Sequence, residues 1–552
     1  MVAVLAFIIP SGASAGPRSA WGSAEAGQAA RVTVFSLTDF HGHIENGPAV
    51  AAAWNRAKSR NPDGAVMVSD GDLVGGSPYD SASQDDEPTL AMAKAWGLSV
   101  SAMGNHELDR GVDDFNGRVA DPSNGISWVS ANVRETDPSA GRLSNLAPYA
   151  MRVVNGVRVA FVGAVTDGLF SVEERRATDG LTLAEPATRS VNKIAERLSD
   201  GDESNGEADV VVALIHEDAD AIADAQTPLS ADVDLVIAGH SHAVKTGRST
   251  PSGAPIVEGG SYGETVACHD LLVSGSGRHA TVRVESVPLG ADGGKGTADA
   301  ASAVTRIADS RVDSGPMVRE TQTILDTARH DAEASGDRVV GTLSQGATFA
   351  KPVSHRPSSS GARVAPAPPD NQLGTLVADS ALASAKASTD PRSRSAVVGF
   401  VNPGSMRQDS LDADGDGRVT ERETHTLLAL RFRNATIELT GAQLRQALAQ
   451  QWRKDGTTLS CLGVSSNVDY DHQYVVNDDG TREVVVIGLT VDGRRVHDGD
   501  RITVAGNSFL LGGGDGYTAF RSGRNYRDTG VGYADALDAY LEANPRLGAY
   551  FG

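Results

Sequence analysis

Five short motifs in the first half of the chain combine carboxylate, imidazole and amide side chains. Six of the 13 histidines fall within them. The motifs are Asp39-Phe40-His41-Gly42-His43, Gly71-Asp72, Gly104-Asn105-His106-Glu107 continuing to Asp109, His216-Glu217, and Gly239-His240-Ser241-His242. Such a ligand set suits Zn, Mn, Fe or Co and disfavours the metals that prefer thiolates. One ion cannot use so many ligands, whereas two ions bridged by an Asp can, and paired metals are a standard device for phosphoester cleavage.

Each motif directly follows a short apolar run rich in Val and Ile, which indicates a buried strand. Long polar or amphipathic stretches separate the runs, a rhythm typical of a layered α/β domain. Open α/β sheets place their sites beyond the carboxyl ends of strands, so we expect the motifs to converge there. The expected strands are Arg31–Leu37, Ala65–Ser69, Ser99–Met103, Ile126–Val133, Arg158–Val165, Asp209–Ile215 and Asp234–Ala238.

The order D-x-H, G-D, G-N-H-E, H and G-H-x-H resembles the calcineurin-like metallophosphoesterases, and DFHGH, GNHELD and GHSH look like the 5′-nucleotidase branch. The resemblance extends from about residue 31 through most of the chain. It implies an α/β protein, with an N-terminal four-layer α/β/β/α metallophosphoesterase domain and a C-terminal α+β substrate-binding domain. Isolated structural histidines would explain single motifs but not an ordered set of five.

The resemblance also implies a role for each motif residue. Asp39, His41 and His242 would hold the first metal, Asn105, His216 and His240 the second, and Asp72 would bridge the two. His106 would face the phosphate as a catalytic residue, and Asp109 would orient it and support its charge. His43 is expected to lie outside the ligand set, because His41 already occupies the ligand position.

The C-terminal half carries a second group of matches. Judged by residue type alone, its phenylalanines read as core and its glycine-rich run as a turn. The resemblance implies instead that two rings sandwich the base, an Asp binds the ribose, and an Asn and an Arg orient the substrate. The residues concerned are Phe432, Phe509, Asp515, Asn402 and Arg407. The chain lacks an Arg close before Asn371-Gln372-Leu373-Gly374 and has Ser405-Met406 before Arg407, which leaves substrate preference open.

Residues 412–423 (DADGDGRVTERE) match the calcium-binding loop of an EF-hand. Oxygen ligands occupy loop positions 1, 3, 5 and 12, and Gly occupies position 6, where the loop turns sharply. The ligands would be the side chains of Asp412, Asp414, Asp416 and Glu423 and the backbone carbonyl of Arg418. The alternative is an acidic solvated turn, and convincing flanking helices are not evident. We expect a structural Ca²⁺ that orders the segment between Arg407 and Phe432.

The chain divides into four expected parts. Residues 1–30 form a signal peptide and leader, since VAVLAFII at residues 2–9 precedes an Ala13-Ser14-Ala15 cleavage pattern. Residues 31–305 form the catalytic domain, 306–338 a helical linker, and 339–552 the substrate-binding domain. Further expectations are helices at Ala300–Arg311, Thr321–Ala334, Leu373–Ala387 and Thr440–Gln451, a Pro-rich linker at 351–369, and strands at Ala396–Val401, Glu483–Thr490 and Arg501–Ala505.

Composition excludes several other classes of protein. The 552 residues carry 71 acidic and 49 basic side chains, a net charge of −22 without basic blocks, which argues against nucleic-acid duplexes and anionic membranes as partners. Two cysteines, Cys268 and Cys461, are too few for a disulfide scaffold, and we expect unpaired thiols. Divalent ions would invert the acidic field where phosphate binds.

The sequence therefore predicts a secreted hydrolase that uses two divalent ions on nucleoside 5′-monophosphates. Two alternatives stay open: a 2′,3′-cyclic-nucleotide phosphodiesterase or nucleotide-sugar pyrophosphatase of the same fold, and an inactive nucleotide-binding surface protein. The native metals, the base preference and the oligomeric state cannot be read from the sequence.

Overall fold

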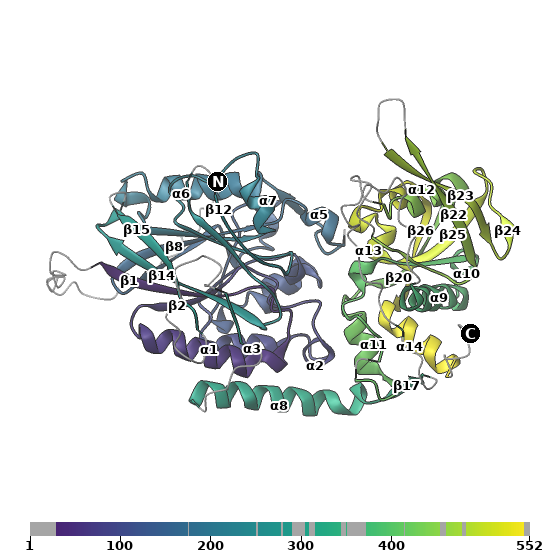
Figure 1. Cartoon of the computed structure of the whole chain (residues 1–552), viewed down its shortest axis with the longest axis horizontal. Coiled ribbons are helices and arrows are strands. Elements are labelled where there is room, and N and C mark those ends of the chain that lie inside the picture. The colour runs from purple at the N-terminus through teal and green to yellow at the C-terminus, as the bar shows by residue number, and fades with distance from the viewer. Residues whose placement is uncertain are drawn as a thin grey trace, which may run out of the picture.

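The computed structural model describes residues 29–174, 176–249, 252–277, 280–289, 304–307, 315–343, 349, 371–412, 414–452, 460–476 and 482–545. The expected signal peptide and the expected 351–369 linker lie outside these ranges. Figure 1 shows two bodies side by side, joined along one edge by a long helix. Among the described helices, none combines the length and the apolar character that a membrane span requires.

Two stacked sheets form the N-terminal body. The first has strand order β15-β14-β1-β2-β3-β4-β6, with β16 beside β14, and the second has order β12-β13-β11-β10-β8-β7. The first contains β1 (Ala30–Leu37), β2 (Ala65–Ser69), β3 (Val100–Ala102), β4 (Ser127–Val129), β6 (Leu146–Ala147), β14 (Thr265–Ser274), β15 (Thr281–Ser286) and β16 (Val304–Arg306). The second contains β7 (Tyr149–Val154), β8 (Val157–Val165), β10 (Val210–His216), β11 (Leu235–Ala238), β12 (Val244–Arg248) and β13 (Pro255–Gly259).

Helices cover both outer faces, so the body has four layers (Figure 1). Valines of β1, β2 and β3 meet Phe161, Val212 and Leu235 of the second sheet in a core between the sheets. One outer face is covered by α1 (Gly47–Arg60), α3 (Glu87–Trp96) and α8 (Pro316–Gly336), and the other by α6 (Ala187–Leu198) and α7 (Ala219–Ala223). The expected α/β/β/α layering is confirmed.

Strands β1 to β4 are parallel to one another, as are β8, β10, β11 and β13. Their carboxyl ends meet at one edge of the stacked sheets, and the segments that follow them carry the five motifs. Short elements complete this body: α2 (Tyr79–Ala82), α4 (Val112–Asp114), α5 (Leu169–Val172), β5 (Val133–Glu135) and β9 (Leu181–Leu183).

Two expectations about local structure are wrong. The helix expected at Ala300–Arg311 contains a strand instead, because Val304–Arg306 pairs with Thr265–Ala267 of β14. The single strand expected at Ile126–Val133 is two strands, β4 and β5. The chain leaves the sheet between them, where the Asn132 side chain bonds to the backbone N–H and carbonyl of Val165. Beyond that point β5 pairs with β9.

The C-terminal body is built on a mixed five-stranded sheet with order β21-β18-β25-β20-β26. Its strands are β18 (Val398–Val401), β20 (Arg433–Thr440), β21 (Gly463–Val464), β25 (Arg501–Asn507) and β26 (Arg524–Gly532). Helices α9 (Gln372–Ala387), α11 (Glu421–Leu427) and α14 (Tyr533–Ala543) enclose one core, and α12 (Gly441–Ala449) covers another. The remaining elements are α10 (Pro391–Arg394), α13 (Ser508–Leu511), β22 (Val468–Val476), β23 (Arg482–Val491) and β24 (Arg494–Arg495).

Helix α8 links the two bodies. It runs beneath α1 and α3 and ends beside α11 (Figure 1). Its Thr321 hydroxyl accepts a hydrogen bond of 3.1 Å from the Trp96 indole, and its Ser335 hydroxyl accepts one of 2.8 Å from Tyr79. The chain then enters β17 (Val339–Thr342), which pairs with β19 (Arg418–Thr420). Cys268 and Cys461 are both buried and free, as expected.

Candidate active site

The motif residues come together at the shared carboxyl edge of the two sheets. Asp39, Asp72 and Asn105 follow β1, β2 and β3 of the first sheet, whereas His216 ends β10 and His240 follows β11 of the second. Five of the expected metal ligands have a positive backbone φ, which is uncommon for residues other than glycine and indicates backbone strain. They are Asp39 (47°), His41 (47°), Asp72 (49°), His240 (70°) and His242 (59°).

A first donor group contains Asp39, His41 and His242. The Nε2 atoms of the two imidazoles are 3.1 Å apart, and His242 Nε2 is 3.7 Å from Asp39 Oδ1. His41 Nδ1 lies 2.7 Å from the Gly75 carbonyl oxygen, so this nitrogen donates and Nε2 is left as the acceptor. Three donor atoms converging from two loops are what a divalent cation requires.

A second donor group contains Asp72, His216 and His240, with Asn105 beside it. His216 Nε2 is 3.0 Å from Asp72 Oδ2 and 3.1 Å from Asn105 Oδ1. The same Asp72 oxygen is 3.5 Å from His41 Nε2, so Asp72 stands between the two groups. This is the place expected of a bridging ligand.

Two glycines allow the loops to approach so closely. A Cβ at Gly239 would lie 1.9 Å from Asp70 Oδ2 and 2.6 Å from Asp39 Oδ2. A Cβ at Gly104 would lie 2.2 Å from Asp72 Oδ1. The glycines before His240 and Asn105 are therefore steric requirements of the site.

Burial and neighbouring charges set the protonation states of the donor residues. Burial raises the pKa of Asp39 to about 8, whereas His240 and His242 are held neutral because burial lowers their pKa values to about 4 and about 3. Burial also disfavours the charged form of Asp72, but the nearby His216 and His106 outweigh this and hold its pKa well below its usual range. Burial opposes the charging of His216, but Asp72 and then Asp39 and Asp70 outweigh it and raise its pKa well above its usual range, so a metal that binds there would displace a proton.

His106 and Asp109 form the expected pair beside the donor groups. His106 Nδ1 is 2.9 Å from Asp109 Oδ1, and its ring centroid is 5.0 Å from that of His41. Burial opposes the charging of His106, but Asp109 and Asp72 outweigh it and raise its pKa to about 9. The site therefore holds a cationic imidazole next to the donor groups.

Four residues near the site were not expected from the sequence. Glu107 accepts backbone hydrogen bonds from Asp72 (2.9 Å) and Gly104 (2.7 Å), so it fixes two motifs to each other. Asp70 and Glu173 are buried beside the second donor group, and the Tyr262 ring lies 5.2 Å from that of His242. Only Glu107 belongs to a motif, and no signal in the sequence points to Glu173 or Tyr262.

His43 is outside both donor groups. Its ring stacks on Tyr262 with centroids 4.0 Å apart, and its Nδ1 lies 2.6 Å from Glu45 Oε1.

The C-terminal body directs Arg407 at the donor groups. A Cβ at Gly76 would lie 3.3 Å from His41 Nδ1 and 3.4 Å from Arg407 Nη2, so the guanidinium approaches the first group. Its Nη2 is buried without a hydrogen-bond partner among the described residues. A buried guanidinium with a free donor can receive an anionic oxygen.

The other expected substrate residues lie in one layer of the C-terminal body. Asn402 donates to Asp515 Oδ2 at 2.6 Å, and Asn507 donates to Asn402 Oδ1 at 2.8 Å. Phe432 and Phe509 stack with ring centroids 5.2 Å apart and an angle of 10° between their planes. This spacing is direct ring-on-ring contact, so a base can enter between the rings only if they separate.

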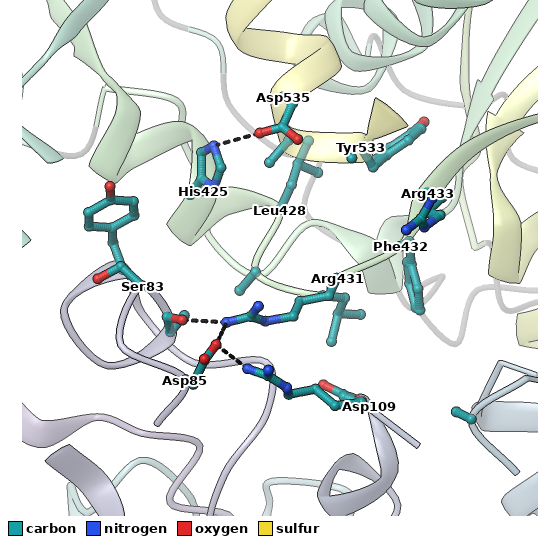
Figure 2. Close-up of a pocket in the computed structure, with 18 of the residues that line it drawn as sticks. Ser83, Asp85, Asp109, His425, Leu428, Arg431, Phe432, Arg433, Tyr533 and Asp535 are labelled. Carbon is teal, nitrogen blue, oxygen red and sulfur yellow. Dashed lines mark hydrogen bonds and ion pairs between the residues drawn. The ribbon is translucent and has the colours of Figure 1, made fainter. Parts of the chain in front are cut away.

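A pocket of about 840 Å³ opens beside Phe432 between the two bodies. Figure 2 shows Arg431 reaching across it from the C-terminal body to Asp85, with Asp109 on the same side as Asp85. Arg431 Nη2 is 3.0 Å from Asp85 Oδ1. The pocket is large enough for a nucleotide, and Asp109 lines it.

The loop at residues 412–423 has several EF-hand features. Asp412 accepts hydrogen bonds from the backbone of Gly415 and Gly417, and α11 begins at loop position 10, after its N-cap Thr420. Glu423 Oε2 accepts from the Thr420 backbone at 2.9 Å in a capping box. A helix thus follows the loop, although none was evident from the sequence, whereas the described residues just before the loop form no helix.

Comparison with known proteins places both bodies in known families. Residues 32–244 match the calcineurin-like phosphoesterase family, and residues 339–522 match the 5′-nucleotidase C-terminal domain. A cell wall protein of Listeria monocytogenes, Lmo0130, is 24% identical over 89% of this chain, and the match covers 64% of that protein. A 5′-nucleotidase of Vibrio parahaemolyticus is 24% identical over 93% of this chain and 89% of its own.

A 5′-nucleotidase precursor from Thermus thermophilus shares the fold, with a TM-score of 0.66 and 18% identity over 94% of this chain and 97% of that one. The chain spans less than two thirds of the Listeria relative. Both matched domains occur here in order, on a fold shared across nearly the full length of a solved relative. The chain therefore belongs to the 5′-nucleotidase family of calcineurin-like metallophosphoesterases.

Proposed function

We propose that this protein is an exported phosphohydrolase that uses two divalent transition-metal ions to release phosphate from nucleoside 5′-monophosphates. The observation that carries the proposal is the pair of donor groups sharing Asp72, with the His106–Asp109 pair beside them. In this proposal residues 31–305 perform the chemistry, 306–338 form the linker, and 339–552 bind the nucleotide.

The donor groups fit two cations by the number and type of their side chains. Asp39, His41 and His242 would hold one ion, Asn105, His216 and His240 the other, and Asp72 both. When bound, Zn, Mn, Fe or Co would polarise the phosphoryl oxygens and make water a stronger nucleophile.

The protein's own groups then orient the phosphate and balance its charge. His106 is cationic below about pH 9 and can donate a proton or a hydrogen bond to the leaving oxygen. Asp109 holds the ring through Nδ1, which leaves Nε2 for the substrate. Arg407 would supply a second cationic donor from the other body.

The nucleoside would be held by the C-terminal body. Phe432 and Phe509 would separate to stack on the base, Asp515 would bind the ribose hydroxyls, and Asn402 would help to orient the substrate. Separating two stacked rings costs part of the binding energy, so the fit between base and clamp would govern KM more than turnover.

The direct test is phosphate release from AMP, UMP, UDP-glucose and 2′,3′-cyclic AMP, each with and without a chelator. We expect chelator-sensitive release from AMP or UMP. Activity confined to the cyclic nucleotide or the nucleotide sugar would replace the proposal by a phosphodiesterase or a pyrophosphatase. Binding of AMP without release from any compound would indicate a nucleotide-binding surface protein.

We further propose that Asp412, Asp414, Asp416, Glu423 and the Arg418 carbonyl bind a structural Ca²⁺. The support is the match to the EF-hand spacing together with the helix that starts at loop position 10. Calcium added to the metal-stripped protein should raise the thermal midpoint, and the Glu423→Gln variant should respond less. An unchanged midpoint in the wild-type protein would refute the site.

A further inference from the structure

Two buried carboxylates that belong to neither donor group lie behind ligands of the same ion. Asp70 is fully buried behind His216, and Glu173, 6% exposed, lies behind Asn105. Both ligands belong to the second donor group. Burying a charged side chain costs free energy unless it is paired with a suitable partner, so the position of each carboxylate needs a physical explanation.

Asp70 faces the outer nitrogen of His216. Asp70 Oδ2 is 3.8 Å from His216 Nδ1, and neither atom has a hydrogen-bond partner among the described residues. The opposite nitrogen, Nε2, points at Asp72 and Asn105. An approach of about 0.6 Å would turn this contact into a hydrogen bond, which would fix Nε2 as the lone-pair nitrogen that a metal needs.

Glu173 acts on the other ligand of the same ion. Asn105 Nδ2 donates a hydrogen bond of 3.0 Å to Glu173 Oε1. Because the amide nitrogen is held there, the amide oxygen must point the opposite way, toward His216 Nε2 at 3.1 Å. The acceptor therefore selects the amide orientation in which the oxygen is available as a ligand.

The first donor group is held in a different way. His41 Nδ1 contacts the backbone carbonyl of Gly75, and the Asp39 oxygens accept from the backbone N–H of His240 at 3.0 and 3.1 Å. Backbone groups thus orient His41 and Asp39 of one ion, whereas carboxylate side chains orient His216 and Asn105 of the other. Side-chain substitutions should therefore separate the two ions.

We propose that Asp70 and Glu173 are positioning residues for the second metal ion, acting through His216 and Asn105 and determining how tightly that ion alone is held. This inference rests on the two-ion assignment proposed above. Carboxylates behind metal-bound histidines orient the ring and increase its basicity, and their loss lowers metal affinity by about 10–100-fold.

The Asp70→Asn variant separates positioning from a structural role. Its side chain has the same shape but carries no carboxylate beside His216 Nδ1. We expect titration calorimetry with Mn²⁺ to show the second ion bound about 10–100-fold more weakly and the first ion unchanged. The metal-free variant should melt no lower than the metal-free wild type. A lower midpoint with both affinities intact would show a structural role.

Glu173 is tested by a pair of substitutions. Glu173→Gln keeps an acceptor for Asn105 Nδ2, whereas Glu173→Met keeps the approximate length and removes the acceptor. We expect the Met variant to bind the second ion about 10–100-fold more weakly than the wild type. The Gln variant should retain most of the wild-type affinity for that ion. Equal affinity for the second ion in the wild type and the Met variant would refute the role of Glu173.

The wild-type titration separates failure of this inference from failure of the proposed function. If the wild type binds fewer than two ions, the two-ion assignment is wrong and the inference falls with it. If the wild type binds two ions and Asp70→Asn and Glu173→Met do so with equal affinity, only the positioning roles are wrong. Loss of both ions together in either variant would also contradict the inference, because the first donor group is oriented by backbone.

Discussion

Backbone strain at the donor residues accompanies their chemistry. Asp39, His41, Asp72, His240 and His242 all have φ between 47° and 70°, in a region that costs about 1–3 kcal/mol for a residue with a side chain. Mutual repulsion of the buried carboxylates adds to this cost. This free-energy cost must be offset by favourable interactions. Cations bound to the donor residues would provide them.

Removing the metals should therefore destabilise the protein. Each of two ions present at about 100 times its Kd contributes about 2.7 kcal/mol, so the two together correspond to roughly 10–20 °C in the midpoint of a domain of this size. We expect calorimetry to show that chelation lowers the midpoint of the N-terminal body by this amount and that Mn²⁺ restores it. A midpoint indifferent to chelator would contradict the assignment.

Replacing His106 should abolish catalysis while leaving the metals in place. His106→Ala removes the cationic donor next to the donor groups but no predicted ligand, so kcat should fall by about 10²–10⁴-fold. Metal analysis should still find two ions. His330→Ala is the matched control, because this side chain is 82% exposed on α8. Turnover preserved in His106→Ala would refute its catalytic role.

The sequence was informative for residues whose type and local spacing carry the signal. The donor residues lie in short motifs after apolar strands, and the structure brings them together. Asp70, Glu173 and Tyr262 acquire their positions only through contacts between distant segments, such as the 3.0 Å bond between Asn105 and Glu173. A single sequence does not reveal such pairings. The direct stacking of the Phe432 ring on the Phe509 ring is likewise not predictable from residue type.

At the scale of elements, buried parallel strands were the easiest to predict. Strands β1, β2, β8, β10 and β11 are continuous apolar runs, and their expected bounds agree with the structure to within a residue or so. Edge strands β12 and β26 were missed because they are largely exposed and polar, so their pairing is set by neighbours. The same reason explains β16, which was expected to be helical.

The capping of α11 gives a prediction at this scale. The Thr420 hydroxyl accepts a hydrogen bond from the Glu423 backbone N–H, and the Glu423 carboxylate accepts one from the Thr420 backbone N–H. Thr420→Ala should cost about 1 kcal/mol of stability, measured as a lower thermal midpoint of the C-terminal body. Thr323→Ala on the exposed face of α8 is the control, because it removes no cap. Equal midpoints for the two variants would show that the cap contributes nothing.

At the scale of the whole molecule, polar contacts join the two bodies around the pocket. Arg431 pairs with Asp85, Arg422 pairs with Asp80, and the Ser508 hydroxyl donates to Glu174. Glu174 is the neighbour of Glu173, and Ser508 is the neighbour of Phe509. The segment Glu173-Glu174 thus connects the C-terminal body to the donor groups. The net charge of −22 describes mainly the outer surface.

His425 makes the stability of this junction depend on pH. It lies between Tyr79 of the N-terminal body, with ring centroids 5.8 Å apart, and Asp538, whose Oδ2 is 3.0 Å from its Nε2. Burial opposes its protonation, but Asp538 and then Asp535 and Glu421 outweigh burial and raise its pKa above 6.5. The folded state therefore binds this proton more tightly than the unfolded state.

The sign of the effect follows from that difference. Below pH 6.5 both states are protonated and the stabilisation from His425 is fully present, and it is lost as the pH rises through the raised pKa of the folded state. The midpoint difference between the wild type and His425→Gln should thus be larger at about pH 6 than at about pH 9. Because both proteins carry the same metal site, its pH dependence cancels in the difference. Asp538→Asn should flatten the same curve, and a difference that stays constant with pH would show that the imidazole contributes packing alone.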